Sequence, residues 1–283
     1  MLQVSLARLR QGHRTIPYPE HEPELPDRFR GLPVVDSSKC ADDCRACAES
    51  CPTNAIMLEE PEVRSQESGI RNQESGVRNQ ESGVSFPPRV RLDLGRCLFC
   101  TACQEACPED AIRYTPEYRL ATRNRDDLVL EGQTLMLADA LEEKMRRLFG
   151  RSLKLRQVSA GGCNACEAEL NVLSTVVFDM ARFGIQFVAS PRHADGIVVS
   201  GAVSENMRTA LLDTYAAIPR PKLVIAVGAC AISGGPYVDN IEVHNGCGSL
   251  LPVDLFIPGC PPHPMTILDG LLRLLGRRVP GTP

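Results

Sequence analysis

The chain has 283 residues, enough for two ordinary domains, and its formal net charge at pH 7 is −4. That charge, the absence of Trp and an aromatic content of only 5% argue against a nucleic-acid-binding surface. The 13 cysteines, an odd number in clusters, favour metal ligation in a reducing compartment over a disulfide framework. The first residues lack the apolar core of a signal peptide, and no apolar run reaches membrane-spanning length. We therefore expect a cytoplasmic protein, held at a membrane only through partners.

After an N-terminal extension, residues 1–30, two cysteine runs indicate an α+β ferredoxin-like domain over residues 31–120. The second run, CLFCTACQEACP, matches the C-x2-C-x2-C-x3-C-P spacing of two-cluster bacterial ferredoxins at every position. The first, CADDCRACAESCP, has one extra residue after its first cysteine. The segments after the runs, TNAIML and EDAIRY, predict matching extended strands and hence an internal duplication.

In such a duplication, three thiolates of each run bind one 4Fe–4S cluster, and the fourth binds the other cluster. The first cluster is therefore assigned to Cys40, Cys44, Cys47 and Cys107, and the second to Cys97, Cys100, Cys103 and Cys51. Zinc is the alternative, because close cysteine pairs also build zinc ribbons. A ribbon needs two pairs per site and has no use for the proline after the fourth cysteine, so the pattern favours iron and sulfur.

Between the runs, residues 64–84 are three tandem copies of a seven-residue unit, beginning RSQESGI. The unit is polar and has a helix-weakening Gly beside its one apolar residue, which disfavours a coiled coil. We expect a solvent-exposed insertion whose deletion is tolerated.

Residues 121–150 are predicted to be a linker that ends in an amphipathic helix over residues 134–150. Its apolar positions recur at helical spacing: Leu137, Leu141, Met145 and Leu148. From Lys144 to Arg156 there are six basic and no acidic residues, which fit a contact with anionic lipid or an acidic partner. A solvated basic end of the linker helix is the simpler interpretation. Gly150 marks the predicted end of the helix and the domain boundary.

Residues 151–283 alternate apolar runs with helical stretches, which predicts an α/β domain with a parallel sheet. The predicted strands are residues 152–159, 185–190, 196–201, 222–228 and 253–259, and the predicted helices are residues 165–184 and 204–218. Three strands lead into cysteines, in VSAGGC, IAVGAC and LFIPGC, and the carboxyl ends of parallel strands meet at one edge. That edge is predicted to hold a third 4Fe–4S cluster, bound by Cys163, Cys166, Cys230 and Cys260. The alternatives are zinc or unrelated core cysteines. Cys247 has no partner left and is predicted to be a free thiol.

Three motifs, GGCNACEAEL, GACAISGG and IPGCPPHP, resemble the signatures of two related proteins. These are the small subunit of group 4, energy-converting nickel–iron hydrogenases and the cluster-bearing 20 kDa subunit of respiratory complex I. The ferredoxin-like region resembles the two-cluster ferredoxin subunit of formate hydrogenlyase-type complexes, so the chain looks like a fusion of the two. The resemblance implies a flavodoxin-like fold without flavin for residues 151–283. Cys163 and Cys166 have the C-x2-C spacing of the hydrogenase side, whereas complex I typically has adjacent cysteines. Glu169 and His263 are candidates for residues beside this cluster.

The resemblance implies an electron-transfer subunit of an oxidoreductase complex, with three 4Fe–4S clusters and no catalytic residue of its own. It would relay electrons between a low-potential donor and the large catalytic subunit of a membrane-associated hydrogenase. That large subunit, or a complex I 49 kDa-like subunit, and further membrane subunits are the implied partners. They would hold the chain at the inner face of the cell membrane. The alternatives are a nickel-free complex that reduces a quinone or another acceptor, and a structural zinc-binding scaffold.

Overall fold

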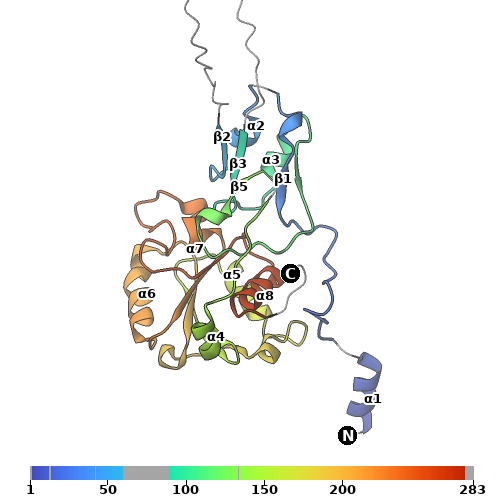
Figure 1. Cartoon of the computed structure of the whole chain (residues 1–283), viewed down its shortest axis with the longest axis vertical. Helices are drawn as coiled ribbons and strands as arrows, with labels where there is room; N and C mark the ends of the chain where they lie inside the picture. Colours follow the sequence, from blue (N-terminus) through green and yellow to red (C-terminus); the bar gives the residue numbers. More distant parts are fainter. Residues whose placement is uncertain (1, 13, 42, 60–88, 133, 278–283) are drawn as a thin grey trace, which may run out of the picture.

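The computed structural model describes residues 2–12, 14–41, 43–59, 89–132 and 134–277. The chain forms a small cysteine-rich unit and a larger α/β unit, which lie one above the other along the long axis in Figure 1. The tandem repeat at residues 64–84 lies outside the described residues. In the part of the chain that is described, no helix is long and apolar enough to span a bilayer.

The first unit is built from short antiparallel strands and one-turn helices. One pair joins β1 (Pro33–Val35) to β4 (Ile112–Tyr114), and a second sheet has the order β2 (Ile56–Glu59), β3 (Arg89–Asp93), β5 (Val129–Glu131). The helical segments are η1 (Ser37–Lys39), α2 (Ala46–Glu49), α3 (Ala102–Glu105) and η2 (Asp126–Leu128). The extended segments predicted after the cysteine runs are β2 and β4, which confirms the ferredoxin-like duplication.

The second unit is a five-stranded parallel sheet of order β10-β9-β8-β6-β7. Its strands are β6 (Leu153–Ser159), β7 (Ile185–Phe187), β8 (Gly196–Ser200), β9 (Leu223–Val227) and β10 (Leu255–Ile257). Every residue of β8 and β9 is buried, as expected for central strands covered on both faces. The five predicted strands and their parallel arrangement are confirmed, and the fold is α/β and flavodoxin-like.

Helices pack on both faces of this sheet, as Figure 1 shows. They are α5 (Ala165–Val172), α6 (Glu205–Ala217), α7 (Ala229–Ser233) and α8 (Pro264–Leu274), with the shorter turns η3 (Met180–Phe183), η4 (Pro191–His193) and η5 (Gly235–Tyr237). The prediction of one helix over residues 165–184 is wrong after Val172. There Thr175 turns its hydroxyl back to donate to the Val172 carbonyl at 2.7 Å, and the β-branched Val176 and Val177 follow.

The predicted helix over residues 134–150 is also shorter than expected. Only α4 (Glu143–Phe149) is helical, and Gly150 caps it as predicted. Before it, the Ala138 N–H donates to the Ala121 carbonyl at 2.8 Å, and the Leu141 N–H donates to the Leu274 carbonyl at 2.9 Å. These bonds to distant carbonyls take the donors that a helix would use. Leu148, which was predicted on the apolar face, is 54% exposed.

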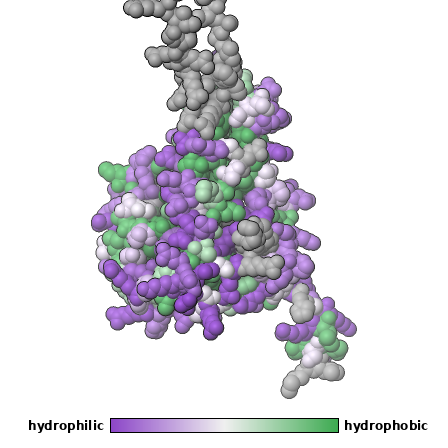
Figure 2. Space-filling view, viewed as in Figure 1, coloured by the Kyte–Doolittle hydropathy of each residue, from purple (hydrophilic) through white to green (hydrophobic). Residues whose placement is uncertain are grey.

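The N-terminal helix α1 (Leu2–Gln11) projects away from the rest of the molecule (Figure 1). Its apolar side chains Val4, Leu6 and Leu9 are exposed, and they give the apolar patches on the projecting helix in Figure 2. The chain rejoins the α/β unit where Thr15 donates its hydroxyl to the Val176 carbonyl at 2.7 Å.

Deleting residues 64–84 should leave the fold intact. The strands on either side, β2 and β3, pair from Ile56 with Leu92 to Glu59 with Arg89, outside the deleted segment. Loop-closure entropy changes slowly with length, so the free energy of unfolding should change by about 1 kcal/mol or less. Urea unfolding followed by circular dichroism checks this expectation. A loss of cooperative unfolding, or of iron bound per chain, would contradict it.

Candidate iron–sulfur centres

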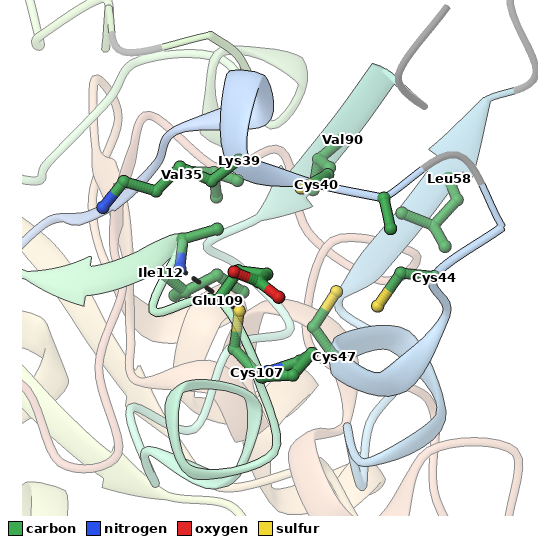
Figure 3. Close-up of a pocket in the computed structure, with 13 residues that line it drawn as sticks. Val35, Lys39, Cys40, Cys44, Cys47, Leu58, Val90, Cys107, Glu109 and Ile112 are labelled. Atoms are coloured by element: carbon green, nitrogen blue, oxygen red, sulfur yellow. Dashed lines mark hydrogen bonds between the residues drawn. The ribbon is translucent and has the colours of Figure 1, made fainter. Parts of the chain in front are cut away.

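The first set of thiols lines one cavity in the cysteine-rich unit. Cys40, Cys44, Cys47 and Cys107 surround a space of about 90 Å³ together with apolar side chains that include Leu58, Val90 and Ile112. Figure 3 shows Cys44, Cys47 and Cys107 gathered on one side of the cavity and Cys40 on the opposite side. The structure thus brings together the four residues that the spacing grouped, including Cys107 from the other run.

The second set has the same three-plus-one composition. Cys97, Cys100 and Cys103 line a cavity with Cys51, which comes from the first run, and with Tyr114. Cys97 is buried, and this burial raises its pKa to about 12. Cys51 follows α2 and Cys107 follows α3, and each lines the cavity of the other run, as the duplication predicts.

The third set lies where strands of the parallel sheet end. Cys163 and Cys166 follow β6, Cys230 lies in α7 after β9, and Cys260 follows β10. Burial raises the pKa of Cys166, and the neighbouring Cys230, Cys260 and Cys163 raise it further. The four predicted thiols are therefore close together at the carboxyl edge of the sheet.

The backbone packs closely against two sulfurs of the third set. Gly228 has a φ of +89°, and a Cβ there would lie 2.5 Å from the Cys166 Sγ. Gly235 has a φ of +55°, and a Cβ there would lie 2.8 Å from the Cys230 Sγ. A positive φ favours glycine, and the close approach to sulfur leaves no room for a side chain at either position. Soft thiolate donors at a glycine-lined edge fit a 4Fe–4S cluster.

Among the described residues, no three His, Cys, Asp or Glu side chains are arranged to share a single metal ion. A four-iron cluster does not need ligands that converge on one ion, because each of its thiolates binds a different iron. Its four ligands therefore surround the cluster, as the four thiols of the first set surround their cavity.

The second set lies between the other two. Burial raises the pKa of Cys47 in the first set to about 11, and Cys103 of the second set is among the nearby thiols that add to this. Burial also raises the pKa of Cys260 in the third set, with contributions from Cys163 and from Cys100 of the second set. In agreement, α2 with Cys47 packs against α3 with Cys103, and Phe99 of the second run lines one cavity with Cys260. The three sets thus form a row in which the second adjoins the other two.

Specific contacts fix the second set against the third. Ser233, at the end of α7, donates its hydroxyl to the Gly95 carbonyl at 2.9 Å, just before Cys97. Arg30 donates to the Phe99 carbonyl at 2.9 Å, inside the cysteine run. Gly95 itself is tightly packed, since a Cβ there would lie 2.8 Å from Ile232 of α7. These contacts hold the two units in one fixed arrangement.

Backbone N–H groups point at several of the sulfurs. The N–H groups of Ala55 and Ala111 lie 3.2 Å from the Sγ atoms of Cys51 and Cys107. Phe99, which has a φ of +53°, places its N–H 3.3 Å from the Cys97 Sγ. Such bonds stabilise negative charge on sulfur and are one means by which a protein sets a cluster potential.

Glu167 is a polar residue of the third set that sequence analysis missed. It is only 6% exposed and accepts a hydrogen bond from the Ser200 hydroxyl at 2.7 Å. Burial alone would raise its pKa, but hydrogen bonds from Ser159 and Ser200 hold that pKa below the usual value. A carboxylate therefore lies next to Cys166. The signal was its position three residues before the buried Leu170, on the inward face of α5.

Glu169 and His263 line one cavity of about 260 Å³ together with Cys260. Burial raises the pKa of Glu169 and lowers that of His263. His263 caps α8, where its Nδ1 accepts from the Met265 N–H at 3.2 Å, and its ring meets Phe29 edge-on at 5.2 Å. Both residues thus lie beside the third set, in the region where sequence analysis expected them.

Cys247 lies apart from all three sets. Its side chain is fully buried in the hydrophobic core, and burial raises its pKa to about 12, with no other thiol contributing. Cys247 therefore belongs to none of the three thiol sets.

Two family models match the chain. Residues 39–111 match the 4Fe-4S dicluster domain, and residues 163–274 match the 20 kDa subunit of NADH ubiquinone oxidoreductase. The NADH-quinone oxidoreductase B subunit of Clostridium beijerinckii is 46% identical over 40% of this chain and 68% of its own length. The chain belongs to this 20 kDa subunit family and carries a 4Fe–4S dicluster region ahead of the family domain.

Two further relatives are named as subunits of a formate hydrogenlyase and of a membrane-bound hydrogenase. Formate hydrogenlyase subunit 7 of Escherichia coli is 41% identical over 48% of this chain, and the match spans about half, 54%, of that protein. A probable membrane-bound hydrogenase subunit of Pyrococcus furiosus is 38% identical over 48% of this chain and 83% of its own length. The resemblance predicted from the cysteine motifs is confirmed.

Proposed function

We propose that the three cysteine sets hold three 4Fe–4S clusters and that the chain relays electrons within a membrane-associated hydrogenase complex. The relay would run between a low-potential donor at the first set and a large catalytic subunit at the third. The observation that carries this proposal is that the three thiol sets adjoin one another: α2 with Cys47 packs against α3 with Cys103, and Phe99 of the second run lines one cavity with Cys260. Adjacent clusters allow an electron to pass from one to the next, whereas a structural zinc site has no need of a second metal site beside it.

When bound, each cluster supplies a one-electron carrier whose potential depends on charge, hydrogen bonds and exposure. The chain's own residues set these conditions. Gly228 and Gly235 let the backbone approach thiols of the third set closely, and the Ala55 and Ala111 N–H groups donate to sulfurs of the other two. The Ser233 contact with Gly95 keeps the second and third sets at a constant separation.

We keep the division of the chain that the sequence indicates. We assign residues 31–120 to the ferredoxin region, 121–150 to a connection and 151–283 to the region that resembles the 20 kDa subunit. The connection contacts both sides, because β5 pairs with β3 and Thr122 exchanges backbone hydrogen bonds with Phe256. Fusion of two subunits that serve the same complex raises the effective concentration of one at the other.

A nickel-free, complex I-like oxidoreductase is the second candidate, favoured by the 46% identity to an NADH-quinone oxidoreductase subunit. The C-x2-C spacing of Cys163 and Cys166 favours the hydrogenase instead. In either case a hydrogenase-type or 49 kDa-like large subunit and further membrane subunits would be the partners. They would hold this chain at the inner face of the membrane.

Purifying the native complex through an affinity tag on this chain separates the two candidates. The hydrogenase predicts nickel in a constant ratio to the tagged chain and reduction of benzyl viologen by hydrogen. A complex without nickel that reduces a quinone or another acceptor would overturn the hydrogenase assignment in favour of the second candidate. The gene for the large subunit gives an independent check, since a nickel site needs a C-x2-C pair near each of its ends.

A further inference from the structure

The two halves of the ferredoxin region can be compared position by position. Counting from the last cysteine of each run, the fourth residue is alanine in both, and its N–H donates to that cysteine at 3.2 Å in both. The seventh residue differs. It is Leu58 at the end of the first half and Tyr114 at the end of the second. The duplication thus preserves the backbone donors but changes one side chain beside each cavity.

Tyr114 presents a hydroxyl to the second thiol set. Its Oη lies 3.9 Å from the Cys103 Sγ, within hydrogen-bonding range for sulfur, and it also interacts with Cys97. The ring is half-buried and packs near Phe99, with ring centres 6.2 Å apart. A tyrosine hydroxyl is protonated at neutral pH and can donate.

Leu58 occupies the matching place beside the first set. It lines the cavity of Cys40, Cys44, Cys47 and Cys107, and Figure 3 shows it on the side of Cys44. Its hydrocarbon side chain offers no donor. The same cavity is lined by the carboxylate of Glu109, whose counterpart in the first half is the neutral Thr53. The Thr53 hydroxyl donates to the Arg96 carbonyl at 2.8 Å.

These differences act in the same direction on the redox equilibrium. Taking up one electron makes a cluster and its thiolates more negative, so a donor at a ligand sulfur favours the reduced form. A nearby carboxylate disfavours it, and a leucine does neither. Tyr114 in place of leucine and Thr53 in place of glutamate therefore both make reduction easier at the second set than at the first.

We propose that Tyr114 is a potential-setting residue, whose hydroxyl raises the potential of the cluster held by Cys51, Cys97, Cys100 and Cys103 above that of the first cluster. This inference rests on the proposed binding of clusters by the two sets. Because the second set adjoins the third, where Phe99 and Cys260 line one cavity, the difference would bias an electron toward Cys260 and away from the first set.

Tyr114→Phe tests the proposal on the full chain, purified anaerobically and titrated with dithionite while EPR is recorded. The variant keeps the ring and removes only the hydroxyl. It should lower the equilibrium constant for one-electron reduction of one cluster by about tenfold, which is about 59 mV, and leave the iron content unchanged. Tyr118→Phe is the matched control, because the Tyr118 hydroxyl donates to Glu22 at 2.9 Å instead of to a sulfur. It should shift no midpoint.

The reciprocal variant Leu58→Tyr places a hydroxyl beside the first set, and it should raise the midpoint of a different cluster. A Tyr114→Phe chain with full iron and unchanged midpoints would overturn the proposal. If Tyr114→Phe loses one cluster, Leu58→Tyr decides: a raised midpoint supports the role of the hydroxyl, and an unchanged one overturns it. A wild-type chain that binds no iron and sulfide would overturn the proposed function itself, which is a separate result.

Discussion

A Cys260→Ala chain should bind about two thirds of the iron and acid-labile sulfide of the wild type, which is about eight of each instead of about twelve. Cys260 follows β10 and completes the third set with Cys163, Cys166 and Cys230. Removing one of four thiolates leaves one iron without a protein ligand, so the cluster should not be retained. The two sets of the ferredoxin region should keep theirs. Metal analysis and sulfide assay on anaerobically purified protein measure the change.

Cys247→Ala is the matched control, because Cys247 is also in the α/β unit but lies apart from the three sets. It should retain the full iron content, with a modest loss of stability from the small cavity in the core. Equal loss of iron in the two variants would show that the domain, and not a specific ligand set, had failed. Unchanged iron in Cys260→Ala would remove this residue from the site.

Asp269→Asn should lower the free energy of unfolding by about 3 kcal/mol or more. Asp269 is fully buried on α8, where it accepts from Arg273 Nε at 2.8 Å and from the Tyr18 hydroxyl at 2.9 Å. Arg273 is only 5% exposed. Neutralising the carboxylate therefore removes the negative charge that the Arg273 guanidinium faces in the core. Because Tyr18 belongs to the N-terminal segment, the same change should loosen that segment from α8.

Asp213→Asn makes the same chemical change at an exposed position on α6 and should shift the free energy of unfolding by less than about 0.5 kcal/mol. Urea denaturation of the two variants, followed by circular dichroism under anaerobic conditions, gives the comparison. Equal urea midpoints for Asp269→Asn and Asp213→Asn would contradict the stabilising role given to the buried pair.

The sequence predicts the strands of the sheet well because their signal is local. β8 and β9 are short runs of Val, Ile, Leu and small residues that are buried on both faces, and no competing pattern overlaps them. The grouping of the thiols is equally local. Spacing alone predicted which cysteines share each of the two ferredoxin cavities, including the exchange of Cys51 and Cys107.

Apart from the helix that ends at Val172, the errors occur where distant parts of the chain decide the local structure. Residues before α4 have a helical pattern, but their N–H groups bond to the Ala121 and Leu274 carbonyls, which no local pattern reveals. Glu167 was overlooked in favour of Glu169 because its partner Ser200 comes from another strand. The sequence also does not predict the spatial order of the three thiol sets, because that order depends on contacts between the two units, such as the hydrogen bond from Ser233 to Gly95.

The most direct test of the account is the amount of iron and acid-labile sulfide per wild-type chain after anaerobic purification, with EPR after dithionite reduction. Three clusters predict about twelve of each, and reduced clusters that lie in a row should give interacting signals. Zinc without sulfide would contradict the electron-transfer account.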